Sequence, residues 1–217
     1  MNYQTTRTNM VESQIRTNKV TDPALIEALS AVPRELFVPA PQRGIAYVDE
    51  DLDLGGGRCL MEPMVLARLL QSANLQPSDR LLDVGCGTGY ATAIAAHVAA
   101  QVIGLESVST HGRRARELLG ELKLANAEII DGPLAAGAPA RAPFDVILLG
   151  GAVAAIPASL TGQLADGGRL LAVVRRAAGL GQAMLTLRVG DGFSSRILFD
   201  AATPLLPEFA PQESFVF

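Results

Sequence analysis

The sequence predicts an α/β protein built on a doubly wound sheet of seven mostly parallel strands. Three observations predict this class. Short apolar runs alternate with helical patterns from residue 80 onward, a glycine-rich turn follows the first run, and the last two runs are joined by a tight turn. Residues 1–79 are expected to form N-terminal helices and a covering loop, and residues 80–217 the core, together making one continuous globular unit.

The N-terminal segment carries helix signals of its own. Asp22 is a capping candidate directly before Pro23, where apolar residues begin to recur at helical spacing. Pro63 suits the first turn of a further helix that is expected to run to about Ala73. The stretch between these two helices has no regular period, so we expect it to be irregular.

The apolar runs of the core are expected to be strands that are buried on both faces of the sheet. Among the first five runs, helical patterns follow the first, the second and the fourth, the last of them after Pro157, which predicts parallel strands with helices on both sides. The last two runs flank Gly190, Asp191 and Gly192, a combination typical of a hairpin, so the sheet should end in an antiparallel pair. In chain order the runs are RLLDV, QVIGLE, AEII, FDVILLG, GRLLAVV, GQAMLTLRV and GFSSRILFD.

Composition argues against several classes of protein. An apolar content of 49% and a mean hydropathy of +0.27 favour a buried core over disorder. A net charge of −4 argues against general nucleic-acid binding. We expect neither a signal peptide nor a membrane span, and hence a cytoplasmic protein. Cys59 and Cys86 are too few for a disulfide framework, and no Cys/His cluster has zinc spacing, so no metal is expected.

The turn after RLLDV places glycine at residues 85, 87 and 89. Glycines at the carboxyl end of such a strand let a ligand rest on the main chain, as in Rossmann-like sheets. No Lys-Ser or Lys-Thr pair follows them, which excludes a P-loop. Tyr90 stands where a dinucleotide fingerprint has its last glycine, which leaves a nicotinamide dehydrogenase as a remote alternative. Glu106 ends the next strand, where a carboxylate can accept both hydroxyls of a ribose.

These features resemble the class I S-adenosylmethionine-dependent methyltransferases. DVGCGTGY is similar to their first motif, GLE to the acidic end of their second strand, and FDVILLGGA to the segment beneath the methionine half. The resemblance implies S-adenosyl-L-methionine as the cofactor, with Asp131 near the adenine amino group. The implied cofactor contacts are Asp83, Gly85, Cys86, Gly87, Gly89, Tyr90, Glu106, Ser107, Asp131, Gly132, Leu149, Cys59, Leu60 and Met61.

The N-terminal third narrows the resemblance. MVESQIR, PRELFVP, AYVDEDLDLGGG and the helix after them follow the layout of the protein-L-isoaspartate O-methyltransferases, and the similarity extends over nearly the whole chain. It implies methyl transfer to the carboxylate of isoaspartyl residues, the first step of protein repair. The expected partner is therefore a protein or peptide that carries a carboxylate. Because a carboxylate is ionised at neutral pH, no general base is required.

The covering loop departs from the family pattern. Family members have Thr-Ile-Ser where this chain has Cys59, Leu60 and Met61. The family serine is thought to help hold the substrate carboxylate, whereas a thioether cannot donate a hydrogen bond. Arg58 is a candidate replacement anchor, the alternative being a solvated loop arginine. Two further functions stay open: methylation of another acceptor, and a catalytically silent protein that binds S-adenosylmethionine. Cys59 and Cys86 are expected to line the cofactor pocket as free thiols.

Overall fold

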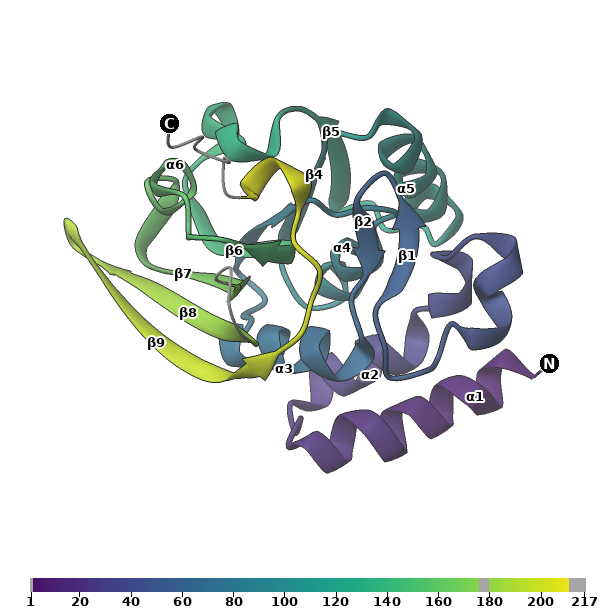
Figure 1. Cartoon of the computed structure of the whole chain (residues 1–217). Helices are drawn as coiled ribbons and strands as arrows, with labels where there is room; N and C mark the ends of the chain where they lie inside the picture. The colour runs from purple at the N-terminus through teal and green to yellow at the C-terminus, as the bar shows by residue number, and fades with distance from the viewer. Residues whose placement is uncertain (1, 176–179, 211–217) are drawn as a thin grey trace, which may run out of the picture.

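The computed structural model describes residues 2–175 and 180–210 and contains a seven-stranded sheet at its centre (Figure 1). The strands lie in the order β5-β4-β3-β6-β7-β8-β9. Those from β5 to β7 run parallel, while β8 is antiparallel to both of its neighbours, so the predicted sheet is confirmed. The strands are β3 Arg80–Val84, β4 Gln101–Glu106, β5 Ala127–Asp131, β6 Phe144–Val153, β7 Leu164–Val174, β8 Gly181–Val189 and β9 Gly192–Ala201.

Helices cover the two faces of the sheet unequally. One face packs against α3, α4 and α5, whose apolar side chains share one core cluster with the N-terminal helices. The other face is covered by the four-residue helix α6, by short 3-10 turns and by the segment that follows β9. The helix expected after Pro157 is therefore only one turn long. The α-helices are α1 Tyr3–Met10, α2 Pro23–Ala31, α3 Pro63–Ala73, α4 Tyr90–Ala96, α5 Ser109–Glu121 and α6 Ala158–Thr161.

Helices α2 and α3 begin where their sequence signals predict. The Asp22 side chain accepts a hydrogen bond of 3.0 Å from the Leu25 amide and so caps α2. Helix α3 spans Pro63–Ala73 as expected, and Asn74 ends it in the left-handed conformation with φ 50°. None of the helices in the described part of the chain has the length and apolar character that a bilayer crossing needs.

The stretch expected to be irregular contains a two-stranded antiparallel ribbon, β1 Leu52–Gly55 and β2 Arg58–Leu60. Its turn consists of Gly55, Gly56 and Gly57, all with positive φ, a conformation that glycine adopts without steric cost. The remaining short turns are the π-helical η1 Val11–Ile15 and the 3-10 turns η2 Arg16–Asn18, η3 Arg34–Leu36, η4 Ala40–Ile45, η5 Leu134–Ala136, η6 Pro139–Arg141 and η7 Pro207–Phe209.

The chain returns across the sheet after β9. In Figure 1 this yellow segment runs from the end of β9 past β6 to a helical turn near β4. Main-chain hydrogen bonds of 2.8 Å join Ala152 to Pro204 and Leu206 to Ala152, which fixes the segment to the end of β6. The segment therefore covers the carboxyl ends of the central strands, the edge where the sequence places the ligand site.

Candidate functional site

The glycine turn forms as predicted. Gly85, Gly87 and Gly89 have φ values of 75°, 55° and 90°, in the left-handed region that favours glycine. The amides of Gly85 and Cys86 donate to the Leu105 carbonyl at 2.8 and 3.2 Å, which ties the turn to β4. Since β3 lies between β4 and β6, this turn marks the point where the strand order reverses, the usual ligand position in such sheets.

The neighbouring strand packs directly on this turn. A Cβ atom added at Gly150 of β6 would lie 2.3 Å from the carbonyl oxygen of Gly85, so only glycine fits there. The preceding Leu149 side chain is fully buried in the core, and Gly150 faces the turn in its place. The structure therefore places Leu149 in the core and its neighbour Gly150 at the cavity above the turn. The Gly-Gly pair directly after the apolar run was the available signal.

A cavity of about 20 Å³ remains above the turn. Both cysteines line it as free thiols, the arrangement expected from the sequence. Burial, followed by the charge of Asp51, raises the pKa of Cys59 to about 12, and burial also raises the pKa of Cys86. The predicted residues at this cavity are Cys59, Leu60, Met61, Asp83, Gly85, Cys86 and Tyr90, joined by Leu66, Ala91 and Gly150.

Asp83 supplies an unpaired carboxylate oxygen to this region. Its side chain is fully buried, and its Oδ2 accepts a 2.7 Å hydrogen bond from the Thr92 hydroxyl. Within the described residues its Oδ1 has no hydrogen-bond partner. Burial, with a smaller contribution from the charge of Glu106, raises the pKa of Asp83 to about 7. A buried acceptor without a partner suits a ligand that brings a donor.

The Asp83→Asn variant is expected to remove a pH dependence of stability. The folded-state pKa of Asp83 is about 7, whereas its ordinary value is 3.8. The contribution of Asp83 to the free energy of unfolding is therefore fully present in acid and is lost as the pH rises through 7. Between pH 5 and pH 8 the parent should lose about 2 kcal/mol of unfolding free energy relative to Asp83→Asn. Urea unfolding at several pH values measures this difference. Parallel curves for the two proteins would contradict the assignment.

Arg34 fixes the covering loop to the body of the protein. It is fully buried, its Nε donates to the Ala46 carbonyl at 2.6 Å, and its Nη2 donates to the Met61 carbonyl at 2.8 Å. Its guanidinium carbon also lies 5.0 Å from the centre of the Tyr90 ring, within cation–π range. The main chain at Met61, beside the cavity, is therefore held by a residue 27 positions away.

The Arg34→Met variant should lower the unfolding free energy by about 3 kcal/mol, because two buried carbonyls lose their donor. Arg16→Met is the matched control, since Arg16 forms an exposed pair with Glu12 and should contribute no more than about 0.5 kcal/mol. Urea unfolding followed by circular dichroism distinguishes the two. Equal losses in both variants would show that Arg34 does not hold the loop.

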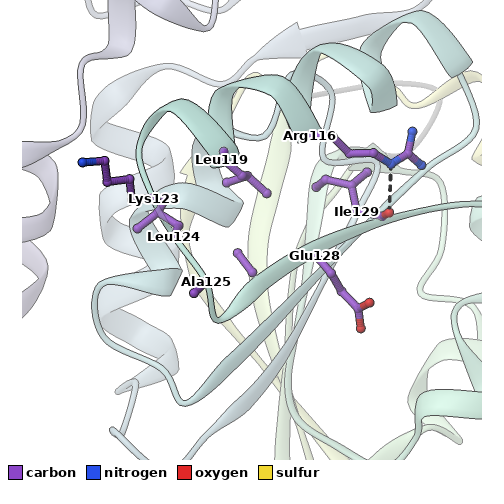
Figure 2. A pocket seen from close by; sticks show the side chains of 9 residues that line it. Arg116, Leu119, Lys123, Leu124, Ala125, Glu128 and Ile129 are labelled. Carbon is purple, nitrogen blue, oxygen red and sulfur yellow. Dashed lines mark hydrogen bonds between the residues drawn. The ribbon is translucent and has the colours of Figure 1, made fainter.

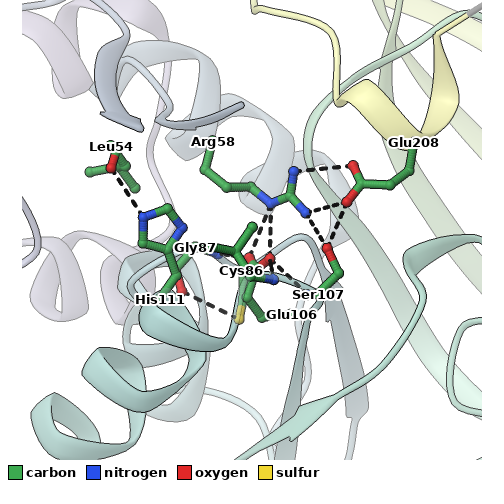
Figure 3. A network of polar contacts seen from close by, with 9 residues as sticks. Leu54, Arg58, Cys86, Gly87, Glu106, Ser107, His111 and Glu208 are labelled. Carbon is green, nitrogen blue, oxygen red and sulfur yellow. Dashed lines mark hydrogen bonds and ion pairs between the residues drawn. The ribbon is translucent and has the colours of Figure 1, made fainter. Parts of the chain in front are cut away.

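Glu106 ends β4 as predicted, and its carboxylate is fully buried in a network of donors (Figure 3). Its Oε2 accepts from the Gly87 amide at 2.7 Å, and its Oε1 accepts from the Ser107 and Val108 amides at 2.8 and 2.9 Å. The Nε of Arg58 lies 3.0 and 3.2 Å from its two oxygens. The carboxylate expected to bind a ribose is thus occupied by an arginine of the same chain.

Arg58 is not a solvated loop residue, since it is only 2% exposed. Its Nη2 donates to the Ser107 hydroxyl at 2.8 Å, and its Nη1 and Nη2 bind the Glu208 carboxylate at 3.1 and 2.6 Å. Figure 3 shows the guanidinium between Glu106 and Glu208. Glu208, which lies in η7, was not among the residues predicted for the site.

The next strand end supplies the residues expected near the adenine. Asp131 pairs in register with Glu106, and the Gly132 amide donates to the Glu106 carbonyl at 3.0 Å. The Asp131 carboxylate is half-exposed and bonds to Arg116 at 2.5 Å. The structure therefore brings Asp131 and Gly132 beside Glu106, at the carboxyl end of the neighbouring strand β5.

A wider depression of about 500 Å³ lies elsewhere (Figure 2). It is formed by the end of α5, the loop after it and residues 127–129 at the start of β5. The predicted ligand residues sit at the opposite, carboxyl ends of the strands, so this depression is separate from the site. Among residues 2–175 and 180–210, no three His, Cys, Asp or Glu side chains gather as metal ligands.

The glycine turn, the strand-end carboxylate of Glu106 and the buried oxygen of Asp83 lie together at the carboxyl ends of β3 and β4, the position where sheets of this kind bind nucleosides. Sequence comparison agrees with this geometry. The sequence model of the protein-L-isoaspartate (D-aspartate) O-methyltransferases matches residues 5–195. The chain belongs to this family.

Individual relatives support the family assignment. A protein-L-isoaspartate O-methyltransferase of Methylorubrum extorquens is 41% identical over 191 residues, covering 88% of this chain and 83% of the relative. A protein-L-isoaspartate O-methyltransferase 1 of an Anaeromyxobacter species is 40% identical over 194 residues, covering 88% of this chain and 89% of the relative.

Two solved structures share the fold. A protein-L-isoaspartate O-methyltransferase superposes with a TM-score of 0.80 at 22% identity, over 92% of this chain and 65% of that one. A Plasmodium falciparum family member in complex with S-adenosyl-L-homocysteine has a TM-score of 0.78 at 22% identity, over 96% of this chain and 99% of that one.

Proposed function

We propose that this protein is an S-adenosylmethionine-dependent methyltransferase that esterifies the carboxylate of isoaspartyl residues in other proteins. The observation that carries the proposal is the family match over residues 5–195, with relatives of that name about 40% identical over most of their length. The site supports it, since the glycine turn, Glu106 and Asp83 meet at the switch point of the sheet.

Residues at the ends of three neighbouring strands would each bind a different part of the cofactor. Glu106 would accept the ribose hydroxyls after Arg58 leaves it, and Asp131 would lie beside the adenine. The unpaired Oδ1 of Asp83 would accept from the amino group of the methionine portion, which satisfies that buried oxygen. When bound, S-adenosylmethionine supplies an electrophilic methyl group on a sulfonium. The chain contributes binding, orientation and the exclusion of water.

The acceptor requires little chemical activation. Its carboxylate has an ordinary pKa near 4 and is ionised at neutral pH, so no residue has to remove a proton. Alignment of bound reactants can contribute roughly 7–11 kcal/mol to such a reaction. Leu60 and Met61 are both buried and form an apolar wall beside the cavity, which keeps water out. Because Met61 has no donor, other donors would hold the acceptor carboxylate.

We further propose that the protein works in the cytoplasm on protein or peptide acceptors. The free thiols of Cys59 and Cys86 support a reducing compartment.

A transfer assay tests the proposed function. The full chain is incubated with S-adenosylmethionine radiolabelled in its methyl group and an isoaspartyl peptide, and the same peptide with a normal aspartyl residue serves as the control. We expect base-labile label on the isoaspartyl peptide alone, because a methyl ester hydrolyses in base. Equal label on both peptides, or none on either by a chain that binds the cofactor, would contradict isoaspartyl methylation.

A further inference from the structure

Arg58 uses the acceptor positions that a bound ribose would need. An ionised carboxylate offers about four lone-pair positions. Glu106 fills them with the Arg58 Nε and with amides of the glycine turn and of the residues that follow β4. The two hydroxyls of a ribose need two acceptors on this carboxylate. They therefore compete with Arg58 for it.

A second chain segment holds Arg58 in place. Glu208, 150 residues away in the sequence, binds both terminal nitrogens of the guanidinium, and its carboxylate also accepts a 2.6 Å hydrogen bond from the Ser107 hydroxyl. A Cβ atom added at Gly57 would lie 2.4 Å from the Pro207 ring, so the C-terminal turn packs directly on the β1–β2 turn. The Leu206 side chain would lie 3.2 Å from a Cβ atom added at Gly85. The segment after β9 therefore contacts both the β1–β2 turn and the glycine turn.

The surroundings of Arg58 allow it to leave Glu106 without becoming an isolated buried charge. The Glu208 side chain is 30% exposed, so Arg58 can stay paired with it while moving toward solvent. Gly55, Gly56 and Gly57 directly precede Arg58, and glycine gives the main chain freedom to move. Burial alone would lower the pKa of Arg58, but Glu208 and Glu106 raise it, so the side chain remains a cation throughout.

We propose that Arg58 is a built-in occupant of the ribose subsite, so that the cofactor binds only after the Arg58–Glu106 ion pair opens. We call the contact among Arg58, Glu106, Ser107 and Glu208 the latch. The latch deepens the proposed function and rests on it, because the competing ligand is the nucleoside of that reaction. The neighbouring cavity above the glycine turn, which Cys59 and Cys86 line, measures only about 20 Å³, far less than the several hundred that a ligand of this size fills, so the covering loop that carries Arg58 also has to move.

Calorimetric titration with S-adenosyl-L-homocysteine tests the latch. The full chain is compared with Arg58→Gln, which removes the occupant, and with Glu208→Gln, which weakens its anchor and leaves Glu106 intact. Arg114→Gln is the matched control, since Arg114 pairs with Glu117 on the surface of α5. We expect at least about tenfold tighter binding by both latch variants, because the population competent to bind rises, and no change in the control.

A second measurement uses no ligand. Cys86 lies buried under the latch, 9% exposed, so its alkylation by a small maleimide should be at least about tenfold faster in Arg58→Gln and Glu208→Gln than in the parent. Where Arg58→Gln does not fold, Glu208→Gln decides both measurements. Equal affinity in all four proteins would overturn the latch and leave the proposed function standing. No binding by any of them would overturn the proposed function and the latch with it.

Discussion

The Gly150→Ala variant should lose at least about 100-fold in affinity for S-adenosyl-L-homocysteine, or roughly 3 kcal/mol. The added methyl carbon would lie 2.3 Å from the Gly85 carbonyl oxygen and 3.0 Å from its carbonyl carbon. Both are main-chain atoms, so the glycine turn has to move as a unit. We also expect the unfolding free energy to fall by about 2–4 kcal/mol, because the space around the turn is already filled.

Gly120→Ala is the matched control for this substitution. Gly120 lies in helix α5, and nothing lies within 4 Å of a Cβ atom added there. Alanine should stabilise the helix by up to about 1 kcal/mol and leave affinity unchanged. Calorimetry and urea unfolding on both variants give the comparison. If Gly150→Ala binds as tightly as Gly120→Ala, the cofactor does not rest on the Gly85 turn.

Glu106→Gln is expected to have the second large effect. The amide nitrogen that replaces one oxygen cannot accept a hydrogen bond. It therefore faces another donor, either Arg58 or one of the main-chain amides that donate to the carboxylate in the parent. Removing one partner of a buried ion pair typically lowers the free energy of unfolding by about 3–5 kcal/mol. We expect a loss of about 3 kcal/mol here, because Arg58 keeps its ion pair with Glu208. Affinity for S-adenosyl-L-homocysteine should fall at least about 100-fold, since the ribose loses its acceptor.

The double variant Arg58→Gln, Glu106→Gln separates the two effects of this change. Removing both charges should recover most of the lost stability, because neither partner is left buried alone, but it should not recover affinity. Urea unfolding and calorimetry measure the two quantities on the same samples. A Glu106→Gln protein that binds with the parent's affinity would show that this carboxylate is not the ribose acceptor.

Local patterns were sufficient to predict the sheet and several helix ends. Helix α3 begins at Pro63 and ends at Ala73 because its start and stop depend on residues adjacent in sequence. The same holds for the hairpin turn after Val189, where Gly190 has a φ of 56°. The glycine turn was predicted because its three glycines and the strand before it are contiguous. A signal of this kind needs no knowledge of distant residues.

The parts of the site that were missed depend on contacts between distant segments. No periodicity of the sequence relates Arg58 to Glu208, because 150 residues separate them, Arg58 begins the short strand β2 and Glu208 lies in the turn η7. The ribbon that carries Arg58 is short, and its strands show too few alternations to be recognised. The ion pair between Arg58 and Glu106 depends on the ribbon and on the contact with Glu208. The position of the Glu106 carboxylate could therefore be predicted from the sequence, but its partner could not.

A crystal structure of the full chain grown with S-adenosyl-L-homocysteine tests the central claim most directly. We predict the ribose hydroxyls within hydrogen-bond distance of the Glu106 carboxylate, the adenine beside Asp131, and the Arg58 Nε no longer bonded to Glu106. A ligand bound outside this crevice, with Arg58 still on Glu106, would contradict the account.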